Sequence, residues 1–205
     1  IDFIARGMSD QYGPLGVKVS GTVTNPVARI AAARPDMGVG LANVVATLRG
    51  SRKGYAIIAE GDSDYGPFDA DVDILSGDGP LTIDVNQGTS FAGVGLTGRI
   101  RQTGPGPFAG QLVAGGSGID GNVQLSAFNG RQRAIIDATA QDAVLPGPAQ
   151  LAIERAIIDV DIILYDRPQV EADVQIAGLR MRDLQIAAAR AKINYAGGQG
   201  TAKVM

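Results

Sequence analysis

The chain has 205 residues, a formal net charge of −3, 29 glycines, and neither cysteine nor histidine. Without cysteine no disulfide or thiolate site can form, and without histidine the side chain most used for acid–base catalysis and zinc binding is missing. No Lys/Arg stretch is both dense and interleaved with aromatic residues, so we expect no nucleic-acid partner. No run approaches the roughly 18 apolar residues that cross a bilayer, and no signal peptide is visible, so we expect any targeting or anchoring element outside this sequence.

The repeating pattern runs into both ends of the sequence, so we interpret residues 1–205 as a single fragment of a longer repetitive architecture, without separate domains. Apolar residues make up 45% of the chain, but aromatic residues only 5%. This balance predicts many short strands of Val, Ile, Leu and Ala that are separated by glycine-rich turns.

Apolar and polar residues alternate along most of the chain, which is typical of strands with one dry and one wet face. The alternation is clearest over residues 68–74, where three aspartates separate four apolar residues. In chain order, the alternating apolar positions are Val17, Val19, Val23, Phe68, Val72, Ile74, Leu81, Ile83, Val85, Val94, Leu96, Val123, Leu125, Ala127, Ala134, Ile136, Ala138, Ile158, Val160, Ile162, Leu164, Val170, Ala172, Val174 and Ile176.

Glycine, proline and asparagine clusters separate these runs and predict turns. They lie at 25–26, 34–35, 65–67, 77–80, 104–107, 115–118, 129–130, 146–148 and 167–168. Asn129-Gly130 between two alternating runs is a strong hairpin signal, so neighbouring strands are expected to be antiparallel.

These features predict an all-β fold, an elongated, curved, antiparallel-rich sheet folded into an open groove. Many inward positions carry Ala, Val or Ile. A closed sandwich of this length would normally bring more large side chains to fill the space between its sheets.

Two segments allow a second interpretation. Asn25-Pro26 could cap a short helix through Arg34, because asparagine favours the N-cap and proline the first helical position. Residues 184–195 are rich in alanine, but their alternation favours a strand. The β-branched residues within 157–163 also favour a strand over a helix.

Three motifs resemble known sites but lack their context. Residues 93–98 match G-x-G-x-x-G, yet no helix-forming segment follows, so we expect glycines in a tightly packed strand. Residues 115–120 resemble one calcium-binding nonapeptide without a second copy, which predicts a lone turn. Asp69, Asp71 and Asp73 lack the glycine and glutamate of an EF-hand loop, so we expect them on a solvated strand face.

No residues were found that could carry an enzymatic reaction. Asp159 and Asp161 share one strand face, but an exterior position lacks the desolvation that shifts a carboxyl pKa for acid–base work. We therefore expect no enzyme activity, no catalytic residues, no metal site and no cofactor.

The apolar side of the alternating strands is the candidate site. The residues expected to line this apolar groove are Phe68, Val72, Ile74, Leu81, Ile83, Val85, Val94, Leu96, Val123, Leu125, Ile136, Ile158, Val160, Ile162, Leu164, Val170, Val174 and Ile176.

In its texture the chain resembles the repetitive β region of the TamB family of AsmA-like envelope proteins, which are inner-membrane components of the translocation and assembly module. The stretches that carry the resemblance are 107–112, 121–125, 133–138, 151–156 and 167–179. The membrane anchor and the C-terminal end of the family are not recognisable in this sequence.

This resemblance implies a β-sheet trough with an apolar inner wall that bridges the periplasm of Gram-negative bacteria. It implies phospholipid or other apolar cargo moving between the inner and outer membranes. It also implies assistance to outer-membrane protein assembly and a TamA-like barrel as partner, bound through regions outside this fragment. The alternative from another class is a structural β-solenoid or adhesin-like stalk with a closed core.

Overall fold

The computed structural model describes residues 1–9, 13–35, 40–77, 79–148, 150–164, 168–196 and 199–205. These residues contain no helix, and so none that could cross a membrane. The strands are β1 (Asp2–Ser9), β2 (Gly13–Gly21), β3 (Pro26–Ala32), β4 (Ala42–Ser51), β5 (Gly54–Ser63), β6 (Gly66–Leu75), β7 (Thr82–Val85), β8 (Ser90–Phe91), β9 (Val94–Gln102), β10 (Phe108–Gly116), β11 (Ile119–Phe128), β12 (Arg131–Leu145), β13 (Leu151–Leu164), β14 (Gln169–Met181), β15 (Leu184–Ala196) and β16 (Gln199–Val204).

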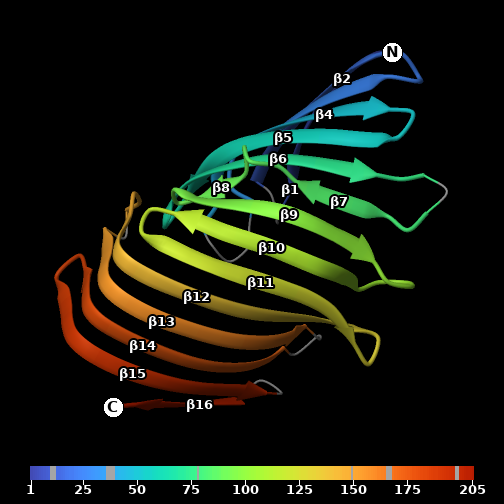
Figure 1. The fold of residues 1–205 in the computed structure, drawn as a ribbon. Helices are drawn as coiled ribbons and strands as arrows, with labels where there is room; N and C mark the ends of the chain where they lie inside the picture. The colour runs from blue at the N-terminus through green and yellow to red at the C-terminus, as the bar shows by residue number, and fades with distance from the viewer. Residues whose placement is uncertain (10–12, 36–39, 78, 149, 165–167, 197–198) are drawn as a thin grey trace.

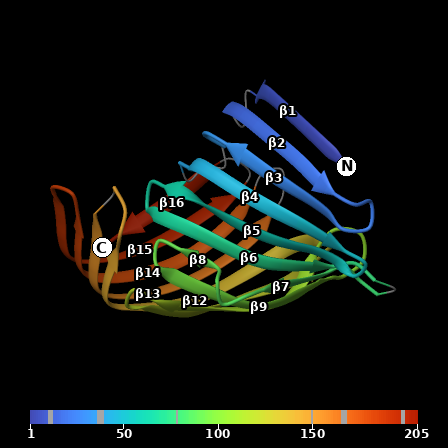
Figure 2. The same ribbon diagram turned by 90° about the horizontal axis from the view of Figure 1, so that it is seen from above.

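All sixteen strands belong to one antiparallel sheet, in which neighbours in space are neighbours in sequence. Only β8 lies off this path, where it pairs with β6 and β9. Figures 1 and 2 show a single layer that curves along its length, with β1 at one end and β16 at the other. The predicted all-β, curved antiparallel sheet is confirmed.

Both segments with a second interpretation are strands. Residues 26–32 form β3, so the alternative of a helix after Asn25 is wrong. Residues 184–196 form β15, and residues 157–163 lie within β13, as their alternation and β-branched residues predicted. Position 23 is a correction, because Val23 lies in the turn after β2 and not in the strand.

The turns follow their local chemistry. Asn129 and Gly130 have φ values of 49° and 74° and join the paired residues Phe128 and Arg131, which is the two-residue hairpin that the sequence predicted. Ser117 and Gly118 join β10 and β11 in the same way, so residues 115–118 form a lone turn. The predicted turns at 77–80 and 167–168 include residues 78 and 167, which lie outside the described residues.

The dinucleotide-like glycines lie in a turn and a strand. Gly93 belongs to the turn between β8 and β9, while Gly95 and Gly98 lie within β9. A Cβ added at Gly98, where φ is +150°, would lie 2.2 Å from the carbonyl oxygen of Gln111. Glycine is therefore required by the close approach of β10, and no helix follows it.

Two side chains take the place of missing backbone pairing. Between β7 and β8 the chain leaves the sheet, and the Thr89 hydroxyl accepts from the Asp71 N–H at 3.0 Å and donates to its carbonyl at 2.9 Å. At the start of β10 the Gln132 side chain accepts from the Phe108 N–H at 2.7 Å and donates to its carbonyl at 2.9 Å. Both satisfy backbone groups that are part-buried and would otherwise lose a partner.

The segment near Thr89 also changes the expectation for the aspartates of β6. Asp69 is exposed, but Asp71 and Asp73 are half-buried, and the Asn86 side-chain amide donates to both carboxylates at 3.0 Å. The prediction of a freely solvated row therefore holds for Asp69 and is wrong for the other two. No pattern in the sequence indicated that residues 86–89 would fold over them.

A bend divides β12 to β15 and turns their ends up on one side of the sheet (Figure 1). Regular pairing is interrupted at Asp142, Glu154 and Gly178, which lie in successive strands. Asp142 and Gly178 have φ values of 48° and 67°, and a Cβ at Gly178 would lie 2.3 Å from the Glu154 side chain. Glycine is favoured there by its positive φ, because the exposed Glu154 side chain could move aside.

The fold lacks a conventional core. Among the described residues no large side chain is fully buried, and the buried apolar residues are the alanines 32, 92, 140, 143 and 156. The accessible surface is 12699 Å², whereas a compact monomer of 21.1 kDa has about 9,000 Å². The excess is the expected result of a sheet without a second layer.

This shape predicts scattering that differs from that of a compact domain. A globular chain of this length has a radius of gyration of about 17 Å, and we expect a clearly larger value for the monomer in small-angle X-ray scattering. A measured value near 17 Å would contradict the single-layer sheet.

The hydrogen bonds between the Thr89 hydroxyl and the Asp71 backbone lead to a second prediction. Replacing Thr89 by valine keeps the shape of the side chain but leaves the Asp71 N–H without its partner, and leaves the Asp71 carbonyl with the Asn86 N–H alone. We expect the free energy of unfolding in urea to fall by about 1–3 kcal/mol. Thr97→Val in β9 is the matched control, with an expected change below about 0.5 kcal/mol. Equal effects of the two changes would show that the Thr89 hydroxyl has no special role.

Candidate functional site

The strand register collects apolar side chains on one face of the sheet, which we call the apolar face. Because residues directly opposite each other in paired strands point to the same side, the face can be followed from strand to strand. One line of paired residues, the central row, crosses the whole sheet without a polar side chain: Phe3, Val19, Ala28, Leu48, Ile57, Val72, Val85, Gly98, Leu112, Val123, Ile136, Val160, Ala172, Ile193 and Ala202.

The rows beside the central row are also apolar. Toward one edge of the sheet, Ile74, Ile83 and Ile100 pair in succession, and Ile162, Val170 and Tyr195 continue the row. Neighbouring strands are about 4.8 Å apart, so the fourteen steps of the central row span roughly 67 Å along the sheet. The apolar face is thus much longer than a single acyl chain.

Every residue predicted to line the groove, with one exception, falls within the paired strands and on the apolar face. The exception, Leu81, directly precedes β7 and is in phase with Ile83. Most are half-buried, whereas Leu164 is 52% exposed. The register brings them together on one surface, and their role as lipid contacts stays a prediction.

Sequence reasoning missed the N-terminal part of this face. Leu48 and Ile57 belong to the central row, but apolar residues on the opposite face, such as Val45 and Ile58, hide the alternation there. It also missed Gln132, the amide that enters the apolar face to pair with β10. Knowledge of the strand register would have identified Ile57, because this residue lies directly opposite the predicted groove residue Val72.

The apolar face is concave at the bend. Ala140, Ala143 and Ala156 are buried there and pack against half-buried isoleucines from both sides of the bend: Ile119, Ile153, Ile158 and Ile176. Side chains before and after a bend can pack together only on its concave side. The apolar face is therefore the inside of the curve, which we call the trough.

The loop between β12 and β13 closes one side of the trough. A Cβ at Gly66 would lie 2.9 Å from the carbonyl oxygen of Pro146, and one at Gly147 would lie 2.0 Å from Tyr65. The loop thus contacts the turn between β5 and β6, although several strands separate them in the sheet. Nearby, Ala92 is 1% exposed and Ser63 donates to the Gly66 carbonyl at 2.6 Å.

The trough is not filled by side chains. Extensive contacts join only strands that are neighbours in the sheet, so the two ends of the sheet do not pack against each other. Phe3 in the central row is 57% exposed. A hollow of about 640 Å³ between Ile157, Gln175 and Arg190 lies mainly on the opposite face. The concave apolar face is an open surface.

Charged side chains are confined to the opposite, polar face in the paired part of the described strands. Three aspartates, Asp137, Asp159 and Asp173, lie directly opposite one another across β12, β13 and β14. Like charges in such positions repel. Lys192, directly opposite Asp173, lies 3.5 Å from it and offsets part of that repulsion.

Arginine–aspartate pairs hold several of these carboxylates in the charged form. The hydrogen bond from Arg133 lowers the pKa of Asp161, and that from Arg190 lowers the pKa of Asp173. Arg99 lowers the pKa of Asp84 in the same way. A carboxyl group that is held ionised is a poor proton donor near neutral pH, which makes Asp161 unsuited to a general acid.

The described residues contain no cluster of acidic side chains with the geometry of a metal site. The arrangement therefore offers a long apolar surface backed by a charged one. Comparison of the chain with protein-family models, with curated proteins and with solved structures gave no match. The resemblance to the TamB family thus stays a hypothesis that rests on the texture of the sequence.

Proposed function

We propose that the trough binds the acyl chains of phospholipids or similar apolar cargo and carries them along the sheet. The observation that carries this proposal is the central row, an unbroken line of apolar residues on a concave face over which no described strand packs. Soluble monomers rarely leave an apolar patch larger than a few hundred Å² exposed unless it has a binding role.

The energetics fit a carrier of acyl chains. Burial of each methylene contributes about 0.8 kcal/mol, so a chain of sixteen carbons gains on the order of 12 kcal/mol from leaving water. A surface that is apolar over roughly 67 Å provides similar contacts at every position along its length. Movement along such a surface avoids the barrier of returning the chain to water.

In this proposal the chain is a segment of a periplasmic, inner-membrane-anchored bridge of the TamB type. The anchor and the contact with a TamA-like outer-membrane barrel would be made by regions outside residues 1–205. Assistance to the assembly of outer-membrane proteins is a further possible role of the same surface, because unfolded barrel strands also expose apolar side chains.

The competing proposal is a structural stalk whose apolar face is its own closed core. That role requires large apolar side chains to be buried by the chain itself. Among the described residues none is fully buried, and Phe3, Tyr55 and Ile193 on the apolar face are more than a third exposed. These exposures favour an open binding surface.

Placing a charge in the trough tests the proposal. Val160 lies in the central row between Ile136 and Ala172, and an arginine there would project into the path of an acyl chain. Because the face is open, the long side chain can reach water at little cost to the fold. We expect Val160→Arg to stay folded and to abolish lipid crosslinking to a photoreactive residue at position 162.

The matched control is Asp159→Arg, which puts the same side chain one residue away on the polar face. We expect it to preserve crosslinking at position 162. Mass spectrometry of copurifying molecules identifies the cargo. A collapsed melting transition for Val160→Arg, together with no crosslink in the parent protein, would support the closed core and contradict the trough.

A further inference from the structure

Basic side chains form a stripe across the polar face of the four N-terminal strands. Lys18 of β2 lies directly opposite Arg29 of β3. Arg6 of β1 is diagonal to Lys18, and Arg49 of β4 is diagonal to Arg29. Each of the four lies an odd number of residues from the central-row residue of its own strand, so all point to the polar face. We call them the basic stripe, which extends over roughly 14 Å from β1 to β4.

The side chains of the basic stripe are exposed, and none forms an ion pair with a residue that the structure describes. Elsewhere on the polar face, Arg99, Arg133 and Arg190 are each bonded to an aspartate. Strands β1 to β4 carry one carboxylate, Asp2, and it lies opposite Ser20. The positive charge of the stripe is therefore available to an external anion.

This arrangement is unfavourable for the sheet by itself. Lys18 and Arg29 are like charges directly opposite each other, and such pairs repel. Charges that protect a sheet edge from aggregation belong on the edge strand, whereas these two lie in the inner strands β2 and β3. The imbalance extends to the whole segment, because residues 1–53 contain seven basic and three acidic residues, and residues 54–205 contain 11 basic and 18 acidic ones. An anionic partner at the N-terminal end would relieve the repulsion.

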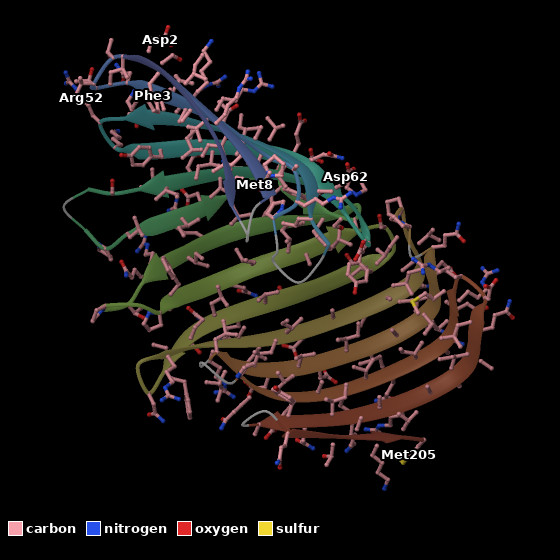
Figure 3. All side chains as sticks on the ribbon, turned by 180° about the vertical axis from the view of Figure 1, so that it is seen from behind. Asp2, Phe3, Met8, Arg52, Asp62 and Met205 are labelled. Carbon is pink, nitrogen blue, oxygen red and sulfur yellow. The ribbon has the colours of Figure 1, made fainter. Side chains whose placement is uncertain are left out.

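Exposed apolar side chains flank the basic stripe on the same face. Ile4 and Met8 of β1 are 63% and 78% exposed, and Ile58 of β5 is 51% exposed. Ile4 lies directly opposite Lys18, and one row of paired residues leads from it across the stripe to Ile58. Figure 3 shows Met8 at the N-terminal end of the sheet, far from Met205. Apolar and basic side chains thus share one open surface at this end.

This combination is typical of protein surfaces that lie on a lipid bilayer. Basic residues are attracted to anionic headgroups, while apolar side chains enter the boundary between headgroups and acyl chains. A nucleic acid fits less well, because bases stack on aromatic side chains and strands β1 to β4 place none on the polar face. Phe3, the one aromatic residue of these strands, belongs to the central row.

We propose that the basic stripe and its flanking apolar residues bind the surface of an anionic lipid bilayer, so that the N-terminal end of the sheet is held at a membrane. The stripe lies on the polar face and the trough on the other, so this inference goes beyond the proposed function and does not depend on it. The four charges are spread over four strands, which suits a layer of many headgroups better than a single ligand.

The test measures cosedimentation of the 205-residue chain with lipid vesicles. One set of vesicles is phosphatidylcholine alone, and the other contains seven parts phosphatidylcholine to three parts phosphatidylglycerol. A basic residue near an anionic surface strengthens binding about fivefold at low salt, so even two stripe residues give a preference of about 25-fold for the anionic vesicles. We expect at least this preference in the parent protein, and we expect high salt to weaken it through screening.

The decisive variant replaces all four stripe residues by glutamine. The matched control replaces four other exposed basic residues, which have no ion-pair partner among the described residues: Arg101, Arg155, Arg180 and Lys203. Both variants therefore have the same net charge. We expect the stripe variant to lose the preference for anionic vesicles and the control to keep it. Because the change removes the repulsion between Lys18 and Arg29, the stripe variant should melt no lower than the parent.

A second pair of variants tests the apolar flank without changing the charge. Ile58→Ser in β5 and Val113→Ser in β10 each remove a β-branched side chain that is 51% exposed on the polar face. We expect Ile58→Ser to weaken binding to the anionic vesicles severalfold, because its side chain enters the lipid boundary, and Val113→Ser to leave binding unchanged.

Several outcomes would overturn the proposal. The parent could show no preference for anionic vesicles, or the stripe variant could keep the preference of the parent. An equal loss in the charge control would reveal a general effect of net charge, and equal effects of the two serine changes would remove the apolar flank from the surface. Stripe-dependent binding of duplex DNA, or stripe-dependent self-association, in place of vesicle binding would assign the stripe to another partner. The crosslink at position 162 reports on the trough separately in every variant.

Discussion

Hydrogen bonds between neighbouring strands connect the described parts of this molecule, because the described residues form a single layer with no second sheet or helix to pack against. In most domains two packed layers bury the apolar face of a sheet, and that burial supplies most of the stability. Here the residues opposite each other in the register give one another partial burial, and the buried positions are small alanines. The register is thus the constraint on which both the fold and the apolar face depend.

The same dependence explains how the sheet treats its interruptions. Where β7 ends early, the Thr89 hydroxyl pairs with Asp71, and where the start of β10 has no backbone partner on the β11 side, the Gln132 amide pairs with Phe108. A one-residue shift at either place would move every following side chain to the other face and mix charges into the central row. The side chains that replace the backbone therefore preserve the separation of the two faces.

The sequence predicted the strand class, the antiparallel pairing and the orientation of the strands after Phe68, because a strict alternation of small apolar and charged residues leaves one choice of face. It could not predict the N-terminal strands equally well, since Val45 and Ile58 place apolar residues on the polar face. The partial burial of Asp71 and Asp73 could not be predicted from the sequence either. Their burial depends on Asn86 and on where residues 86–89 cross the strand, which is tertiary information.

Because each strand contacts essentially its two neighbours only, the energetics of the sheet are close to those of a one-dimensional array. The total stability is then approximately the sum of pairing terms between adjacent hairpins, and a weak pair opens locally without releasing the distant ones. Such an array can gain or lose hairpins without changes in the other strands, since the described strands do not pack around a common core. The length of the apolar surface consequently depends on how many hairpins the gene encodes, which gives evolution a simple way to lengthen or shorten it.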